Sequence, residues 1–327
     1  MDNRTPLSLK HLFDLYLASN NPMKILLTGA SGLVGSNVAK VASRRGHEIL
    51  GIASSWSEDI PGVNHLHRLD LQDENETTAL ILAYFPDAIV NAAAISDPAA
   101  CEKDPVLSRA INVTLPGVLA KIAHHLGARL IHLSSEQVFD GKNNPYYPTD
   151  PVCPINLYGQ QKVVSEQQVE SFAPETSTTI RIPLLSGNSL TAHHSLHEKL
   201  FALWSAGKKT PLFADEFRQP CSAENLSEVI VELCERVDLT GKFHWAGTES
   251  LSRLEMGTQI LNHFKLPETL IEESSQKTVS EITPRQPNLA FKCDALTQKL
   301  KTSPQTFSEQ LELLNVPKPF QSWYHST

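Results

Sequence analysis

Short apolar runs and longer mixed stretches alternate along the first 183 residues of the chain. The apolar runs show no strict alternation with polar positions, which is typical of strands that are covered on both faces. The pattern therefore predicts an α/β fold with a doubly wound parallel sheet. Strands are expected at residues 24–28, 48–53, 66–69, 88–91, 129–134 and 178–182, and helices at 33–45, 74–84, 105–125 and 157–172.

The pattern becomes less regular after Pro183, where helices are expected at 194–206, 224–236 and 252–264, and strands at 210–213 and 242–245. We interpret residues 23–183 as the doubly wound domain and residues 184–327 mainly as a smaller C-terminal lobe, of which the 224–236 helix could pack back on the sheet. The tail after residue 317 is expected to be weakly ordered. Residues 1–22 form an N-terminal extension with helical spacing of apolar side chains, predicted to be a docked helix or an arm.

Three glycines, Gly29, Gly32 and Gly35, directly follow the first predicted strand. The first permits a tight turn, the second lets a phosphate approach the backbone, and the third allows the helix to pack closely on the strand. The helix that begins here presents unpaired N–H groups and the positive end of its dipole. A glycine-rich string alone is weak evidence, but its place between a strand and a helix predicts a Rossmann-type dinucleotide site.

A serine and a tyrosine–lysine pair follow further along the chain. Ser135 stands at the end of the strand at 129–134, and Tyr158 and Lys162 share one face of a predicted helix. Taken singly, the serine is more often a turn or cap residue, and the pair is more often a solvated helix face. Their order after the glycine loop favours catalysis. In that interpretation the ammonium lowers the pKa of the phenol, the serine holds a substrate oxygen, and the phenol transfers a proton during hydride transfer.

The amino-acid composition argues against several classes of function. The net charge of −8 argues against a nucleic-acid surface, and no apolar run approaches the ~18 residues that a membrane helix needs. The five cysteines are scattered and form no Cys-x-x-Cys motif, which fits free thiols in a reducing compartment. Without a recognisable targeting signal, we expect a cytoplasmic location. His193, His194 and His197 lack a carboxylate partner at a metal-site spacing, so we expect a partly exposed helix there and no metal.

Over residues 23–300 the chain resembles the extended short-chain dehydrogenase/reductase superfamily, and within it the dTDP-4-dehydrorhamnose reductase group. The likeness is carried by residues 29–35, 91–94, 110–112, 134–141, 156–162 and 181–183. One branch is still more similar, the regulatory β subunit of methionine adenosyltransferase, through residues 181–185, 241–247 and 284–288. That subunit has the reductase fold and binds NADP, but serves as the partner of another enzyme. Gln137 departs from the reductase group, which commonly carries tyrosine there.

The resemblance implies a Rossmann domain, a substrate-binding lobe and a set of site residues. The implied catalytic residues are Ser135, Tyr158 and Lys162. The implied cofactor residues are Gly29, Ser31, Gly32, Leu33, Val34, Gly35, Ser54, Ser55, Asp70, Leu71, Ala92, Ala93, Ala94, Asn112, Tyr158, Lys162 and Ile182. The implied substrate residues are Asp97, Arg218 and Gln219. Two of these assignments have an open alternative: Arg218 either holds a diphosphate or forms a surface salt bridge, and Asp70 either meets the adenine or forms an ordinary turn.

The end of the second predicted strand bears on the choice of cofactor. An NAD site usually places an acid there to hold the ribose 2′-OH, whereas this strand ends in Ser54 and Ser55. NADP(H) is therefore favoured over NAD(H), although no arginine stands beside the serines in the sequence.

Two hypotheses remain. The chain is either an NADP(H)-dependent reductase (or epimerase) of a nucleotide-linked 4-keto sugar, or a non-catalytic NADP-binding regulatory subunit. The second hypothesis implies a methionine adenosyltransferase catalytic subunit as partner. A homodimer is compatible with both.

Overall fold

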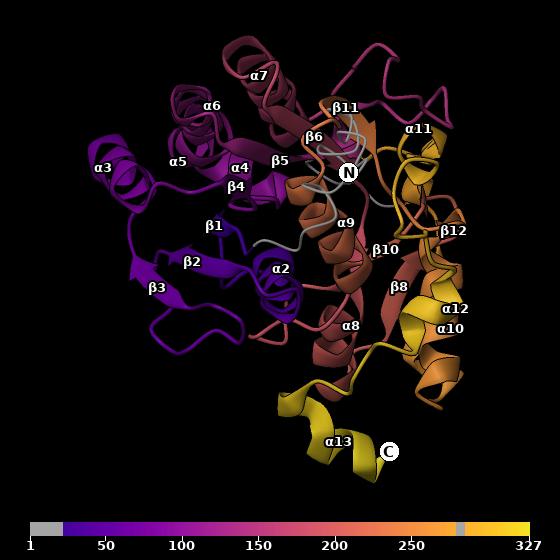
Figure 1. Ribbon diagram of the computed structural model, residues 1–327. Coiled ribbons are helices and arrows are strands. Elements are labelled where there is room, and N and C mark those ends of the chain that lie inside the picture. The colour runs from indigo at the N-terminus through magenta and orange to yellow at the C-terminus, as the bar shows by residue number, and fades with distance from the viewer. Residues whose placement is uncertain (1–21, 279–284) are drawn as a thin grey trace, which may run out of the picture.

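The computed structural model describes residues 22–278 and 285–327 of the chain. Its main sheet contains β1 (Lys24–Thr28), β2 (Glu48–Ala53), β3 (His65–Arg68), β4 (Ala88–Asn91), β5 (Arg129–Ser135), β6 (Ser177–Ile182) and β11 (Gly241–His244). The strand order is β11-β6-β5-β4-β1-β2-β3, and every neighbouring pair is parallel (Figure 1). The predicted doubly wound α/β fold is confirmed, and the six strands expected before residue 183 lie within one residue of their predicted bounds.

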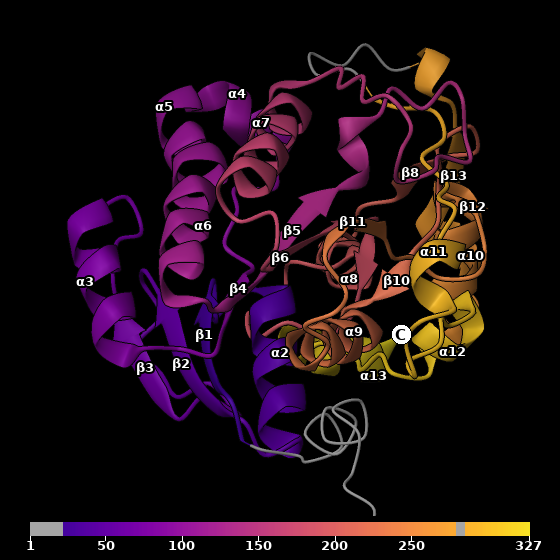
Figure 2. The same cartoon turned by 45° about the horizontal axis from the view of Figure 1, so that its top comes forward.

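Helices cover both faces of this sheet (Figure 2). On one face, α2 (Leu33–Arg44) and α9 (Ala223–Glu235) form a core with the strands. On the other face, the strands are covered by α3 (Glu74–Tyr84), α6 (Leu115–Leu126) and α7 (Leu157–Phe172). Local sequence sets the ends of these helices. The Asp73 carboxylate accepts a hydrogen bond from the Glu76 N–H at the start of α3, and Gly127, with φ of 67°, ends α6.

The helix predicted over 105–125 is interrupted by a wider turn. It consists of α5 (Pro105–Arg109), a π-helical turn (Ala110–Thr114) and α6, preceded by α4 (Pro98–Lys103). In the described part of the chain, the run Pro105–Leu126 is the one helix long and apolar enough to cross a membrane, which the sequence analysis did not expect. Its most apolar window is 56% buried inside the protein, because the apolar side chains of α6 pack on the sheet.

A second lobe with its own core is built from the later segments. Its elements are β7 (Leu185–Ser186), α8 (Leu196–Ser205), β8 (Thr210–Phe213), β9 (Phe217–Arg218), β10 (Cys221–Ser222), β12 (Leu251–Ser252), α10 (Arg253–His263), β13 (Ile271–Ser274), α12 (Phe307–Leu311) and α13 (Gln321–Ser326). The short helix α11 (Asp294–Thr297) packs against β11 instead, with its buried Leu296 in the core of the main sheet. The tail expected to be weakly ordered forms α13 instead. Its Trp323 and Tyr324 rings lie 5.9 and 6.3 Å from the ring of buried Phe201, so the tail is part of the lobe core.

Two elements that follow the lobe's first segments return to the main sheet. β11 pairs with β6, and α9 packs beside α2, as the sequence left open for residues 224–236. Residues 242–245, interpreted from the sequence as part of the smaller lobe, thus belong largely to the edge of the main sheet. The helix expected within residues 1–22 lies outside the described residues.

The histidine-rich segment does not form the helix face that its spacing suggested. Ser195 and Glu198 form a capping box, so α8 begins after Ser195. His197 then lies inside the helix and is 1% exposed, whereas His193 precedes the helix and is exposed. Among the residues with described positions, no group of three His, Cys, Asp or Glu side chains is arranged to hold a metal.

Candidate active site at the carboxyl edge of the sheet

The glycine loop between β1 and α2 has the geometry of a phosphate cradle. Gly29 has φ of +66°, and a Cβ there would lie 2.9 Å from the Ala92 backbone. A Cβ on Gly35 would lie 2.1 Å from the Gly29 oxygen, so only glycine lets α2 approach β1 this closely. A Cβ on Gly32 would meet only the Gly29 oxygen, at 3.2 Å, and otherwise faces open space.

The start of α2 leaves room and donors for an anion. No side chain caps the first turn, which begins at Leu33 and Val34, and it carries no acidic residue. Its N–H groups and dipole therefore face the space in front of Gly32, the arrangement that binds a pyrophosphate. The cradle and its donors fit a dinucleotide.

A chain of buried polar side chains crosses the sheet next to this loop. The Thr28 hydroxyl donates to Asn91 Oδ1 at 2.8 Å, and Asn91 Nδ2 lies 3.1 Å from His132 Nδ1. His132 Nε2 lies 3.0 Å from Ser165 Oγ, which donates to the Lys162 carbonyl at 2.8 Å. Burial holds the pKa of His132 well below its ordinary value. The neutral ring can complete this chain with its proton on Nε2.

This polar relay, the chain from Thr28 through Asn91 and His132 to Ser165, was not predicted from the sequence, although its signal was present. Thr28 ends β1, Asn91 ends β4, and His132 follows the apolar pair Leu130 and Ile131 in β5. The strand register places these residues side by side, Thr28 beside Asn91 and Asn91 beside His132. The relay ties β1, β4 and β5 to α7, the helix that carries Tyr158 and Lys162.

Tight contacts at the start of α7 bring Tyr158 to Ser135. The Asn156 side chain caps the helix by accepting from the Gly159 N–H at 2.8 Å. A Cβ on Gly159 would lie 2.2 Å from the Gln137 carbonyl oxygen, so glycine is required for this approach. Ser135, at the end of β5, is hydrogen-bonded to the Tyr158 phenol, and both residues are nearly buried.

The predicted direction of the Tyr158 pKa shift was wrong. Burial raises the pKa of the phenol above its ordinary value, and the hydrogen bond with Ser135 only partly opposes this. Lys162 Nζ lies 5.9 Å from the phenol ring centre and donates to the Leu133 carbonyl at 2.9 Å. Burial lowers the pKa of Lys162 to about 8. The lysine is thus held beside the phenol, but desolvation dominates the acidity of both groups.

The other predicted cofactor residues gather at the same carboxyl edge, with one exception. Exposed Ser54 and Ser55 follow β2, Asp70 and Leu71 follow β3, Ala92, Ala93 and Ala94 follow β4, Ser31 lies in the glycine loop, and Ile182 ends β6. Asn112 differs, because it is fully buried and its amide binds the Ile95 backbone N–H and carbonyl, each at 3.0 Å, and Gln161 Oε1 at 2.8 Å. It secures the segment after β4 to α7, and its amide is fully used within the protein.

The three residues predicted to contact the substrate each have partners within the protein. The Asp97 carboxylate caps α4 by accepting from the Ala99 N–H at 2.8 Å. Gln219 donates to the Gly247 carbonyl at 2.6 Å and accepts from the Phe291 N–H at 2.7 Å. The polar ends of both side chains are therefore used in holding backbone segments together.

Arg218 is the centre of a buried ionic cluster at the junction of the two lobes. Its Nε lies 3.0 Å from Glu136 and its Nη2 lies 3.2 Å from Glu216, while Nη1 donates to the carbonyls of Phe217 and Gln286. The side chain is 8% exposed. The salt bridges of Arg218 are therefore buried and not on the surface, whereas a diphosphate contact stays a prediction. Burial raises the pKa of Glu136, the residue after Ser135, to about 7 despite the arginine.

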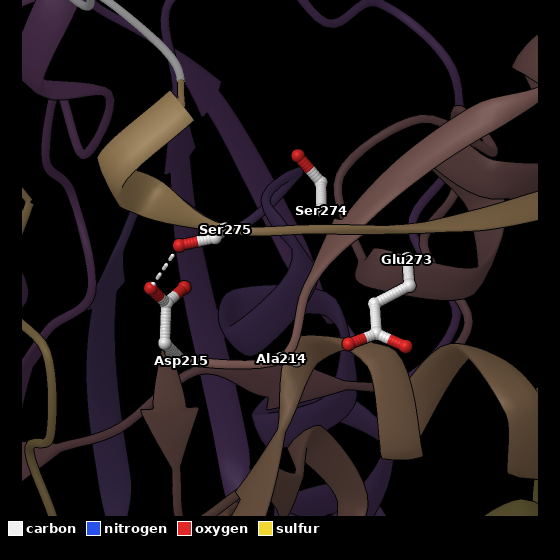
Figure 3. Close-up of a pocket in the computed structure, with 5 residues that line it drawn as sticks. All are labelled: Ala214, Asp215, Glu273, Ser274 and Ser275. Atoms are coloured by element: carbon white, nitrogen blue, oxygen red, sulfur yellow. Dashed lines mark hydrogen bonds between the residues drawn. The ribbon is translucent and has the colours of Figure 1, made fainter.

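A separate pocket of about 420 Å³ lies in the smaller lobe, where β8 and β13 end (Figure 3). Asp215 and Glu273 make its lining acidic, and the Asp215 carboxylate accepts from the Ser275 hydroxyl and the Gln276 N–H. An acidic lining is unfavourable for an anionic nucleotide sugar. The chemistry of the glycine loop and Ser135 therefore defines the candidate site.

Comparisons with known proteins agree with this geometry. The family model described as the RmlD substrate binding domain matches residues 23–316. A probable low-salt glycan biosynthesis reductase, Agl14, of Haloferax volcanii is 30% identical over 77% of this chain and 84% of its own. Methionine adenosyltransferase 2 subunit beta of Xenopus laevis is 30% identical over 84% of this chain and 81% of its own.

Solved structures share the fold. The crystal structure of a hypothetical dTDP-4-dehydrorhamnose reductase from Sulfolobus tokodaii has a TM-score of 0.78 and 28% identity, covering 90% of this chain and all of that one. Other proteins with this fold have been solved in complex with NADP or with NAD.

Proposed function

Because the chain belongs to the family of the RmlD substrate binding domain, within the extended short-chain dehydrogenases/reductases, we propose that it is an NADP(H)-dependent reductase of a nucleotide-linked 4-keto sugar. The observation that carries the proposal is the meeting of Ser135, Tyr158 and Lys162 at the carboxyl edge of the sheet, beside the glycine loop. These are the groups that carbonyl reduction by a nicotinamide requires.

The residues have distinct roles in the proposed reaction. The bound dinucleotide supplies the hydride. The Ser135 hydroxyl donates a hydrogen bond to the substrate carbonyl oxygen, and Tyr158 delivers the proton that turns this oxygen into a hydroxyl. A phenol whose pKa is raised stays protonated at neutral pH, which suits the acid role in reduction. Lys162 adds positive charge beside the phenol and holds the nicotinamide ribose.

The sugar class follows from relatives of this chain. The Haloferax volcanii relative is described as a glycan biosynthesis reductase, and the Sulfolobus tokodaii structure as a hypothetical dTDP-4-dehydrorhamnose reductase. NADP(H) is proposed over NAD(H) because β2 ends in Ser54 and Ser55 without an acid. We place the reaction in the cytoplasm, since all five cysteines are free thiols.

The test follows the nicotinamide absorbance while purified protein, NADPH and a panel of nucleotide-linked 4-keto sugars react. Oxidation of NADPH with at least one sugar is expected. Tyr158→Phe should lower this turnover about 10²- to 10⁴-fold and leave NADPH affinity unchanged, because only the transferable proton is lost. Tyr147→Phe, at a tyrosine that is 53% exposed, serves as the matched control. Full turnover by Tyr158→Phe would contradict the mechanism.

A second candidate function rests on the methionine adenosyltransferase relatives. The Xenopus laevis subunit has the same 30% identity as the reductase relative and matches 84% of this chain, against 77% for the reductase. In that role the chain would be an NADP-binding regulatory subunit of a methionine adenosyltransferase. Such a subunit should be inert across the sugar panel, form a stable complex with the catalytic subunit and alter its kinetics. Turnover with a keto sugar and no such complex would exclude this alternative.

A further inference from the structure

An arginine lies beside the end of β2 although none follows that strand in sequence. In the parallel register, Ala53, the last residue of β2, is the partner of Arg68, the last residue of β3. Neighbouring strands lie about 4.8 Å apart, a distance that an arginine side chain easily spans. Arg68 can therefore reach the segment after β2, where Ser54 and Ser55 stand.

Arg68 lies on the same face of the sheet as the glycine loop. Side chains alternate between the two faces of a strand, so Leu66 and Arg68 project to the same side. Leu66 packs in the core formed with α2, on the face where the glycine loop leads into that helix. Ala30 of this loop donates its N–H to the Ile52 carbonyl at 3.1 Å, so the loop and the end of β2 are in direct contact.

Arg68 also has the exposure that a binding residue needs. Its side chain is exposed, and in the part of the chain that the structure describes no carboxylate lies within 4.0 Å of its guanidinium. This contrasts with Arg181 and Arg218, which are buried in ion pairs with glutamates. Glu58 and Asp59, in the connection between β2 and β3, are exposed and form no ion pair with it.

Ser54, Ser55 and Arg68 thus stand at the ends of two neighbouring strands, beside the glycine loop that would hold the dinucleotide. We propose that Arg68, with Ser54 and Ser55, binds the 2′-phosphate of NADP(H) and sets the preference over NAD(H). This inference rests on the proposed dinucleotide site and adds the residue that selects the cofactor. A guanidinium forms charge-assisted hydrogen bonds with a phosphate, whereas a 2′-hydroxyl offers it no charge.

The test measures the dissociation constants of NADPH and NADH by nicotinamide fluorescence, without any sugar. Arg68→Ala should weaken NADPH about 10- to 100-fold, as expected for hydrogen bonds to a charged group, and leave NADH unchanged. Arg68→Lys should retain part of the preference, because it keeps the charge but not the fork of donors. His67→Ala is the matched control, since His67 is the exposed neighbour on the opposite face of β3.

Adenosine 2′-monophosphate and adenosine 5′-monophosphate, titrated in competition with NADPH, give a second readout. Arg68→Ala should weaken only the 2′ isomer. An unchanged NADPH preference in Arg68→Ala would overturn the inference while leaving the reductase proposal intact, and so would an equal loss of both dinucleotides. Because no sugar is present, a failure to reduce any keto sugar does not affect this result. Tighter NADH than NADPH binding by the unmodified protein would overturn the inference directly.

Discussion

Glu136 should make the stability of this protein fall as the pH rises through the neutral range. Its side chain is 6% exposed, and its pKa is raised from 4.5 to about 7 by burial. The Arg218 guanidinium 3.0 Å away only partly offsets that burial. Because the folded pKa is above the unfolded one, the folded state binds the proton more tightly. The resulting stability is fully present below pH 4.5 and is lost as the pH rises through about 7.

The magnitude follows from the pKa difference. At about 1.4 kcal/mol for each pH unit, the difference between 4.5 and about 7 corresponds to a loss of about 3 kcal/mol. Glu136→Gln removes the titration but keeps the shape of the side chain. The unfolding free energy of this variant, relative to the unmodified protein, should therefore increase by up to ~3 kcal/mol between pH 4.5 and pH 8.

Urea unfolding at a series of pH values, without substrate or cofactor, measures this difference. Both proteins share every other titrating group, so the comparison isolates Glu136. The pKa of about 7 already includes the attraction of Arg218, so the ion pair adds no separate pH dependence to this difference. Glu170→Gln, at a carboxylate that is 62% exposed and paired with Lys242, is the control and should run parallel to the unmodified protein. Parallel curves for Glu136→Gln as well would refute the reasoning.

Three further predictions concern other positions. Gly35→Ala should destabilise the fold by about 1–3 kcal/mol in urea unfolding. Gly32→Ala should leave the stability nearly unchanged but weaken NADPH binding in a fluorescence titration. The reverse order of the two effects on stability would contradict the loop geometry. Arg181→Met should cost about 3–5 kcal/mol, because Glu166 is left buried and unpaired, and adding Glu166→Gln should restore part of the loss. Lys162→Met should unfold at a higher urea concentration than the unmodified protein at pH 7, because a buried ammonium with a pKa of about 8 is costly to charge; equal or lower resistance would contradict this.

The sequence predicted what is encoded in neighbouring residues. Strands such as β1 and β4 were recognisable as short apolar runs, because helices cover both faces of the sheet. The glycine loop and the Tyr158–Lys162 pair each depend on a spacing of a few residues. These short-range patterns located the sheet, its carboxyl edge and the residues gathered there.

What the sequence could not predict depends on partners that are far away along the chain. From the sequence, Arg218 was interpreted as a possible ligand for a diphosphate. The sequence could not show that it pairs with Glu136, because that residue lies on the other lobe. The polar ends of Gln219 are taken by the backbone of Gly247 and Phe291. The direction of the Tyr158 pKa shift depends on burial, which spacing does not reveal. In each case folding supplies a neighbour or removes water.

The return of α9 and β11 to the main sheet has a consequence for how the chain is synthesised. When β6 leaves the ribosome, its outer edge has no partner, and β11 follows only after most of the lobe's first segments. Arg129, buried at the start of β5, binds the carbonyls of Leu233 and Leu239, which arrive equally late. A nascent chain that ends near residue 183 thus exposes an open strand edge and leaves Arg129 with only its partners Thr176 and Thr178. The two lobes should therefore mature together, and proteolysis of stalled chains should find the first lobe unfolded until residue 244 has emerged.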